Sequence, residues 1–164
     1  QVKVSEPDRV RFSGKGAGAG MMLMSTMGPM GMAVGVAIDE GIGKDIDKTA
    51  KATAIDFEQL FNQELDAYLG SPEAKKINKQ PQLVIKVTKY GFVTTSGDND
   101  PVTANIHLEY SFDNTNWQQL QFPEQFKMKE SIPKAPLDKI KTKPEQISKL
   151  VKESLQYLLP KINL

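Results

Sequence analysis

The sequence predicts a single α+β domain, in which a three- to four-stranded, mainly antiparallel sheet is covered by two helices. Three observations lead to this prediction. Residues 45–69 and 144–159 show the apolar periodicity of helices, three segments between residues 82 and 122 alternate like strands, and a length of 164 residues suits one hydrophobic core. A segment rich in glycine, alanine and methionine, residues 14–43, adds a helical hairpin or arm near the N-terminus. We assign residues 1–164 to one domain.

The first part of the chain predicts an extended element and, further on, a long helix. Residues 2–12 place apolar residues around a polar centre with a proline, which predicts two short extended pieces or one interrupted edge strand. In residues 45–69, apolar side chains recur every three or four positions, which predicts one amphipathic helix. Asp45 or Asp47 is expected to cap its start, and Gly70 is expected to end it.

The middle of the chain predicts a three-stranded meander. Residues 82–95 alternate, and Gly91 is expected to mark a bulge. Residues 102–112 alternate without interruption, so this strand is expected to have one apolar and one wet face. Turn-forming residues at 96–101 and 113–116 separate the three strands, of which the last covers 117–122.

The C-terminal third predicts a connection and a helix. Residues 123–143 are rich in proline and lysine, which indicates a long surface connection. Pro144 then opens the final helix, whose apolar side chains again recur at helical spacing, and Pro160 ends it.

The uncharged segment is the least ordinary part of the chain. Between Lys15 and Asp39 lie 23 residues without a charge, 16 of them Gly, Ala or Met, and they include six of the seven methionines. Small residues bury little area, and glycine costs about 1 kcal/mol per helical position. The segment must therefore gain from close backbone approach, a membrane, a partner or a metal. Because Gly28 and Pro29 interrupt it, we expect two short helical arms, about 17–27 and 30–38, or a hairpin of them.

Glycines spaced by four within this segment and just before it predict a glycine zipper. The pairs are Gly14 and Gly18, Gly16 and Gly20, and Gly31 and Gly35. On a helix this spacing forms a flat groove where another backbone packs closely. A hairpin packed on the domain, on a second copy or partly into a bilayer is favoured over one membrane-spanning helix or a disordered segment. The predicted interaction segment consists of Gly16, Gly20, Met21, Met22, Met24, Met27, Met30, Gly31, Met32 and Gly35.

A thioether metal site is the alternative interpretation of the same segment. Its ligands would be Met22, Met24, Met27 and Met30, which form M-x-M and M-x-x-M pairs. Soft thioethers select Cu(I) or Ag(I), and this spacing resembles the methionine motifs of copper transporters and periplasmic copper carriers. Methionine also fills adaptable apolar contacts, which favours docking over metal binding.

Other functional classes find little support in the sequence. The glycines at 14–20 lack both the βαβ context of a dinucleotide site and the Gly-Lys-Ser/Thr ending of a Walker loop. His107, the only histidine, is expected to be a surface residue on the polar face of its strand. The chain has no cysteine, and its net charge of +1 gives no basic excess for nucleic acid. We therefore expect no enzymatic activity, no cofactor and no nucleic-acid partner.

The chain resembles the mature part of a Gram-negative envelope lipoprotein, cut after its acylated cysteine. The features that carry this resemblance are the glycine-zipper arms, the absence of cysteine, a start at Gln1 and a small αβββα unit. The auxiliary lipoproteins of secretion and transport systems are similar in style. The resemblance implies a non-catalytic protein of the periplasm, tethered to the outer membrane by an N-terminal lipid. It would dock onto an envelope protein partner, a second copy or a membrane.

Overall fold

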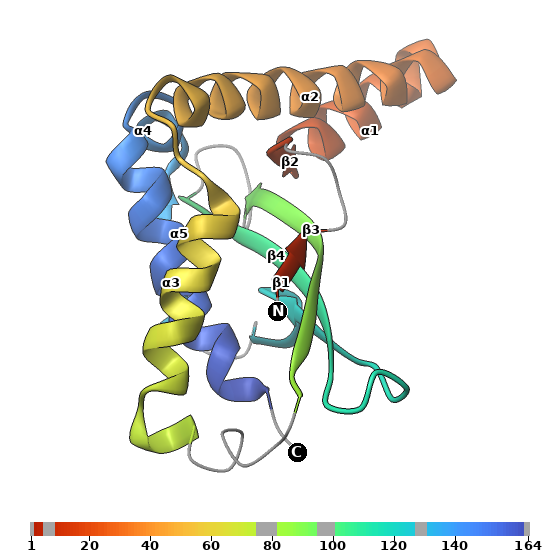
Figure 1. The fold of residues 1–164 in the computed structure, drawn as a ribbon. Coiled ribbons are helices and arrows are strands. Elements are labelled where there is room, and N and C mark those ends of the chain that lie inside the picture. The colour runs from red at the N-terminus through yellow and green to blue at the C-terminus, as the bar shows by residue number, and fades with distance from the viewer. Residues whose placement is uncertain (1, 5–8, 75–81, 95–100, 127–130, 163–164) are drawn as a thin grey trace.

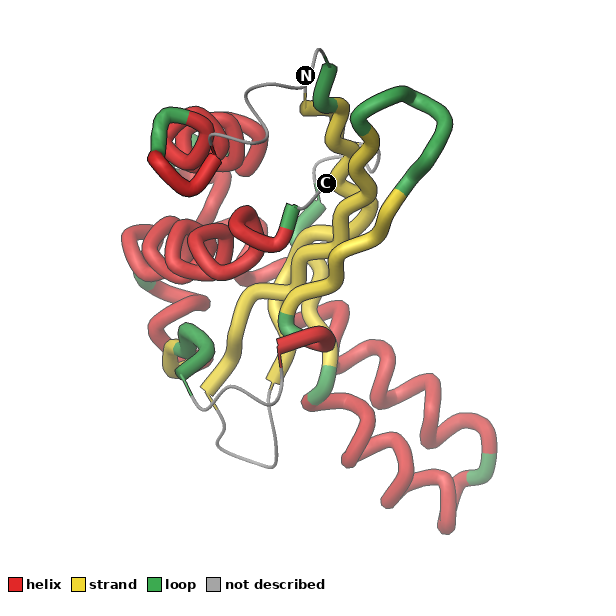
Figure 2. Tube along the Cα trace, turned by 90° about the horizontal axis from the view of Figure 1, so that it is seen from below, coloured by secondary structure: helices red, strands yellow, loops and turns green. Residues whose placement is uncertain are grey.

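The structure is a computed structural model that describes residues 2–4, 9–74, 82–94, 101–126 and 131–162. It shows an α+β fold in which helices lie against one side of a sheet, while a helical hairpin projects beyond the rest of the molecule (Figures 1 and 2). The hairpin consists of α1, Lys15–Met27, and α2, Pro29–Ala52. The predicted α+β class and the N-terminal helices are confirmed.

The sheet is larger than predicted, and it is mixed. The predicted meander is present as β3 (Val84–Thr94), β4 (Pro101–Ser111) and β5 (Gln118–Phe122), which pair antiparallel. Two short N-terminal strands, β1 (Val2–Val4) and β2 (Arg11–Ser13), both pair parallel with β3, and β6 (Ala135–Pro136) pairs with β4. The described residues thus form six strands, not three to four. The helices between β2 and β3 provide the long crossover that parallel pairing needs.

Two details of the predicted strands are wrong. The register of β3 against β4 shifts between Val87 and Lys89, so the irregularity does not lie at Gly91. A Cβ at Gly91 would instead collide with the backbone of Arg11, which means that this glycine lets β2 pack at the sheet edge. The face of β4 that was expected to be wet is partly enclosed, since Thr103 is fully buried.

The predicted helix over residues 45–69 is divided into two. α2 continues through this region to Ala52, and α3 spans Phe57–Leu69. Asp56, rather than Asp45 or Asp47, caps α3, because its carboxylate accepts hydrogen bonds from the backbone N–H groups of the next turn. α3 ends before Gly70, as predicted.

The C-terminal third holds more structure than the predicted surface connection. A 3-10 turn (Glu124–Phe126), β6 and α4 (Leu137–Thr142) occupy much of residues 123–143, and Phe126 and Ile140 are buried. α5, Pro144–Leu158, begins at the predicted proline, and a 3-10 turn over Leu159–Lys161 follows it. The buried face of α5 consists of Ile147, Leu150, Val151, Ser154, Leu155 and Leu158.

Turn predictions fall on both described and undescribed residues. The turn at 113–116 is confirmed: Asp113 accepts hydrogen bonds from the backbone N–H groups of Thr115 and Asn116, and Asn114 has a φ of 61°. Of the turn predicted at 96–101, residues 96–100 lie outside the described residues.

Candidate functional site

A seam of four glycines holds the α1–α2 hairpin together. Gly16 and Gly20 of α1 face Gly31 and Gly35 of α2, and all four are buried. A Cβ added at Gly16 or at Gly35 would collide with the backbone of the opposite glycine, and one at Gly31 would collide with the backbone of α1. The glycines of the predicted interaction segment are therefore used inside the hairpin, where they let the two helices approach closely.

Asp39 closes the base of this seam. Its carboxylate oxygens accept hydrogen bonds from the backbone N–H groups of Gly14, at 3.0 Å, and Gly16, at 2.7 Å. These groups lie at the start of α1, where N–H groups lack helical partners and a negative charge is favourable. Gly14 and Gly18 do not belong to the seam, because an added Cβ would meet Thr94 at Gly14 and nothing within 4 Å at Gly18. Asp39 is not among the residues predicted from the sequence, although it is the first charge after the uncharged segment.

The second half of α2 anchors the hairpin to the rest of the fold. Gly43 lies against β2, where an added Cβ would stand 3.3 Å from both Phe12 N and Val10 O. Ile46 and Ala50 then enter the hydrophobic core. The buried residues of α2 are Gly31, Gly35, Gly43, Ile46 and Ala50. One helix face thus packs first on α1 and then on the sheet, which connects the hairpin firmly to the core.

The apolar side chains of the hairpin face solvent. Met21, Met22 and Met30 are 72%, 77% and 68% exposed. Within the described part of the chain, every large apolar side chain that is exposed belongs to this hairpin: Met21, Met22, Met24, Met27, Met30, Met32, Val34, Val36 and Ile38. We call these residues the apolar rim. Single exposed apolar side chains are common, whereas many of them on one element are typical of an interaction surface.

The helix separates some of the ligands proposed for the alternative metal site. At about 100° per residue, Met22 and Met24 point about 160° apart on α1, so they cannot meet on one ion. Met24 and Met27 lie one turn apart on the same side of α1. Met30 belongs to α2, beyond the turn. The Cu(I) or Ag(I) site remains a prediction, and the hairpin keeps only part of its ligand set together.

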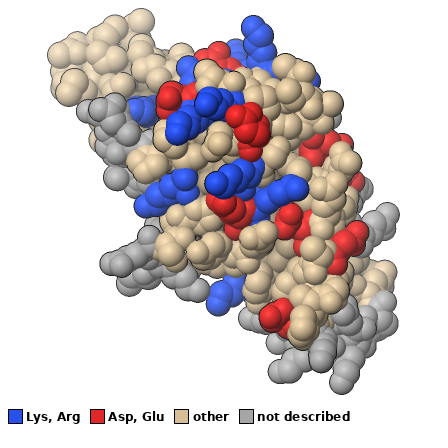
Figure 3. All heavy atoms as spheres, turned by 90° about the vertical axis from the view of Figure 1, so that its left-hand side faces the viewer, with Lys and Arg blue, Asp and Glu red and all other residues tan. Residues whose placement is uncertain are grey.

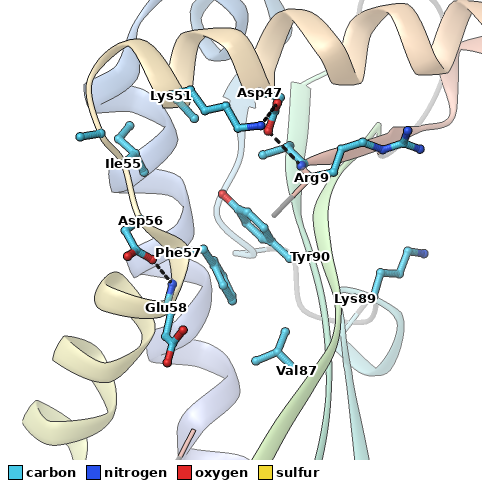
Figure 4. Close-up of a pocket in the computed structure, with 13 residues that line it drawn as sticks. Arg9, Asp47, Lys51, Ile55, Asp56, Phe57, Glu58, Val87, Lys89 and Tyr90 are labelled. Atoms are coloured by element: carbon cyan, nitrogen blue, oxygen red, sulfur yellow. Dashed lines mark hydrogen bonds and ion pairs between the residues drawn. The ribbon is translucent and has the colours of Figure 1, made fainter. Parts of the chain in front are cut away.

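A pocket of about 600 Å³ lies where α2, α3 and the sheet meet (Figure 4). The ring of Tyr90 stacks on Phe57, with 3.8 Å between the ring centroids. Asp47 accepts a hydrogen bond from the backbone N–H of Val10 at 3.4 Å and pairs with Lys51 at 2.8 Å. Burial and, to a smaller extent, the charge of Asp47 raise the pKa of Tyr90, so its hydroxyl stays protonated. These contacts join α3 to β3, and they join α2 to the residue that precedes β2.

His107 is partly enclosed, with a side chain that is 21% exposed. Its Nε2 lies 3.5 Å from a carboxylate oxygen of Glu124. Burial and the charge of Lys89 lower the pKa of His107, and Glu124 opposes this effect. Among the described residues, no three His, Cys, Asp or Glu side chains are grouped to hold a metal.

Charges of both signs alternate over the face seen in Figure 3. Lys141 pairs with Asp45 at 2.8 Å, which connects α4 to α2, and Lys149 lies 3.8 Å from Glu153 on α5. Such mixed charges keep this face hydrated, and they create no large patch of positive or negative potential across it.

Comparison with protein-family models, with curated proteins and with solved structures finds no match. In the described part of the chain, no helix has the length and apolar character that crossing a membrane requires.

Proposed function

We propose that this protein is a non-enzymatic docking or assembly module that binds its partner through the apolar rim of the α1–α2 hairpin. One observation carries the proposal: the exposed large apolar side chains of the described chain all gather on one projecting element. The glycine seam makes that element rigid without using the methionines, which stay free for contact. A location in the periplasm, an outer-membrane tether and an N-terminal lipid belong to this proposal and rest on the sequence resemblance alone.

The energetics favour docking through the rim. Full burial of one methionine side chain contributes about 1.5 to 3 kcal/mol, less the cost of ordering it. Six methionines therefore offer ample free energy for association, and their flexible thioethers adapt to an irregular surface. Association should also cost little reorganisation, because the backbone of the hairpin is already formed.

The test replaces four rim methionines, Met21, Met22, Met30 and Met32, together by glutamine, which has a similar shape but is polar. We expect the purified variant to unfold at the wild-type temperature, since the exposed side chains contribute little to stability. Co-sedimentation with a crude envelope membrane preparation, which contains both lipids and proteins, should fall by at least about tenfold. Equal co-sedimentation of both proteins would contradict the proposal, as would a wild type that neither co-sediments nor self-associates.

A leucine variant at the same four positions is the matched control. Leucine keeps the apolar surface but removes the thioether sulfur, so docking should persist in this variant. Loss of association in both variants would instead indicate that the sulfur atoms matter, as a thioether metal site requires.

A further inference from the structure

We propose that the partner of the apolar rim is the hydrocarbon of a single membrane leaflet, which the hairpin enters tip first. This inference rests on the proposed docking function and names its partner. Insertion to half the depth of a bilayer would hold the folded body at the membrane surface, with the sheet and its covering helices in water.

The first argument is that the rim surrounds the hairpin. On α2, at about 100° per residue, Met30 and Val34 share one side of the helix, and Met32 and Val36 share another, about 160° away. All four are exposed, and only the direction taken by the glycine seam is covered. A protein partner covers one side of a helix pair, whereas lipid chains contact every side. The distribution of exposed apolar side chains therefore fits a lipid environment.

The second argument is that the length of the uncharged arm and the positions of the first charges both match one leaflet. At about 1.5 Å per residue, the uncharged arm from Gly28 to Ile38 is about 15 Å long. The hydrocarbon of one leaflet is about as thick, half of roughly 30 Å. Charges begin at the base of both arms, with Lys15 on α1 and with Asp39 and Glu40 on α2. The apolar rim thus ends where the headgroups of a leaflet would begin.

The third argument is that several polar groups near the tip have internal partners. Ser25 donates its hydroxyl hydrogen to the carbonyl of Met22 at 2.7 Å, and Thr26 donates to that of Leu23 at 3.1 Å. At the turn, the N–H of Gly28 bonds the carbonyl of Met24 at 3.0 Å. Pro29 opens α2 and has no N–H to satisfy. Hydrocarbon provides no hydrogen-bond partners, so such internal bonds are what insertion demands.

The glycine seam is also suited to lipid. Between two helices in hydrocarbon there is no hydrophobic driving force, and close packing of small residues replaces it. The backbones at Gly16 and Gly35 approach so closely that no side chain fits between them. The hairpin can thus remain a hairpin after water has been removed from around it.

The test is flotation with protein-free vesicles of phosphatidylethanolamine and phosphatidylglycerol. We expect the full chain to float with the vesicles. A charge at the tip, Met30→Asp, should reduce the vesicle-bound fraction by at least about tenfold, because a carboxylate in hydrocarbon is costly. The matched control is Gly41→Asp, which adds the same charge to α2 at an exposed site beyond the base, where an added Cβ meets no neighbour. This control should float like the wild type.

Depth is measured with a fluorescent label. The chain has no cysteine, so Met30→Cys and Lys44→Cys each give one labelling site for an environment-sensitive dye. The emission of a label at position 30 should shift to shorter wavelength on vesicle binding and be quenched by acyl-chain quenchers. A label at position 44 should keep its aqueous emission. Equal quenching at both positions would overturn insertion into a single leaflet.

Two other outcomes separate this inference from the proposed function. If the wild type binds crude envelope membranes but not protein-free vesicles, the partner is a protein: docking stands and the lipid inference fails. If the chain forms dimers through the hairpin and ignores vesicles, the occupant is a second copy, and the lipid inference fails as well. If it binds neither preparation and forms no dimer, both proposals fail.

Discussion

Single residues decide where the helices of this chain begin and end. Ala54 adopts a φ of 50°, a left-handed conformation that interrupts the helical path after Ala52. Asp56 then restarts the helix by accepting the N–H groups of Glu58 and Gln59 at 2.8 and 3.2 Å. The apolar periodicity continues across this break, which is why it predicts one helix where the structure has two.

His107 leads to a prediction about pH dependence. Its pKa is lowered in the folded state, mainly by burial, so the unfolded chain binds a proton more readily. The folded state therefore loses stability as the pH falls through the ordinary value of about 6.5 towards the lowered pKa. We expect His107→Gln to lose less stability than the wild type between about pH 7.5 and pH 5. Urea denaturation at both pH values measures this difference, and equal losses in the two proteins would contradict it.

At the scale of elements, the hairpin depends on steric fit between glycines. An added methyl group at Gly35 would meet the carbonyl oxygen of Gly16 and stand 3.1 Å from the Cα of Gly20. Backbone atoms cannot rotate away as side chains do, so the two helices would have to separate. The same addition at Gly41, further along α2, meets nothing within 4 Å.

This contrast gives a matched pair of variants. Gly35→Ala should destabilise the hairpin by about 1 to 3 kcal/mol through overpacking. Gly41→Ala should leave stability unchanged or raise it by up to about 1 kcal/mol, because alanine favours helix over glycine. Hydrogen exchange of the α1 and α2 amides reports the opening of the hairpin in each variant. If Gly35→Ala destabilised the hairpin no more than Gly41→Ala does, the close approach of the helices would not be required.

At the scale of the whole molecule, the hairpin is an addition to a complete core. No residue from 16 to 38 belongs to the hydrophobic core cluster, whereas Phe12, Ile46 and Ala50, which lie on either side of that range, do. The two ends of the projecting part are close together, because Asp39 accepts hydrogen bonds from Gly14 and Gly16. A short linker can therefore replace residues 16–38.

Replacement of residues 16–38 by a short Gly/Ser linker should leave a folded body. We expect one cooperative thermal transition within a few degrees of the wild type, since the substitution removes no core side chain. Membrane association should be lost at the same time. Circular dichroism during heating measures the first result and co-sedimentation the second. Loss of the cooperative transition would make the hairpin part of the core and remove the basis of the docking proposal.

The sequence by itself determined the local features of this protein. Periodicity located most helices and strands, turn residues placed the turn at 113–116, and Gly28 with Pro29 placed the tip of the hairpin. The missing charges and the clustered methionines predict that residues 16–38 contact a partner, and this stays a prediction. These features depend on neighbouring residues alone, which is why they can be read directly from the chain.

Only the tertiary structure decided what lies next to what. The parallel pairing of β1 and β2 with β3, and the contact of Gly91 with Arg11, join residues far apart in sequence. The different positions of the glycines and the methionines within the hairpin also depend on packing. Glycines and methionines are mixed along the segment, but α1 and α2 turn the glycines toward each other and leave the methionines outside. The glycines face inward because only they allow the two backbones to approach so closely. The spacing of residues along the chain does not specify which helix packs against which.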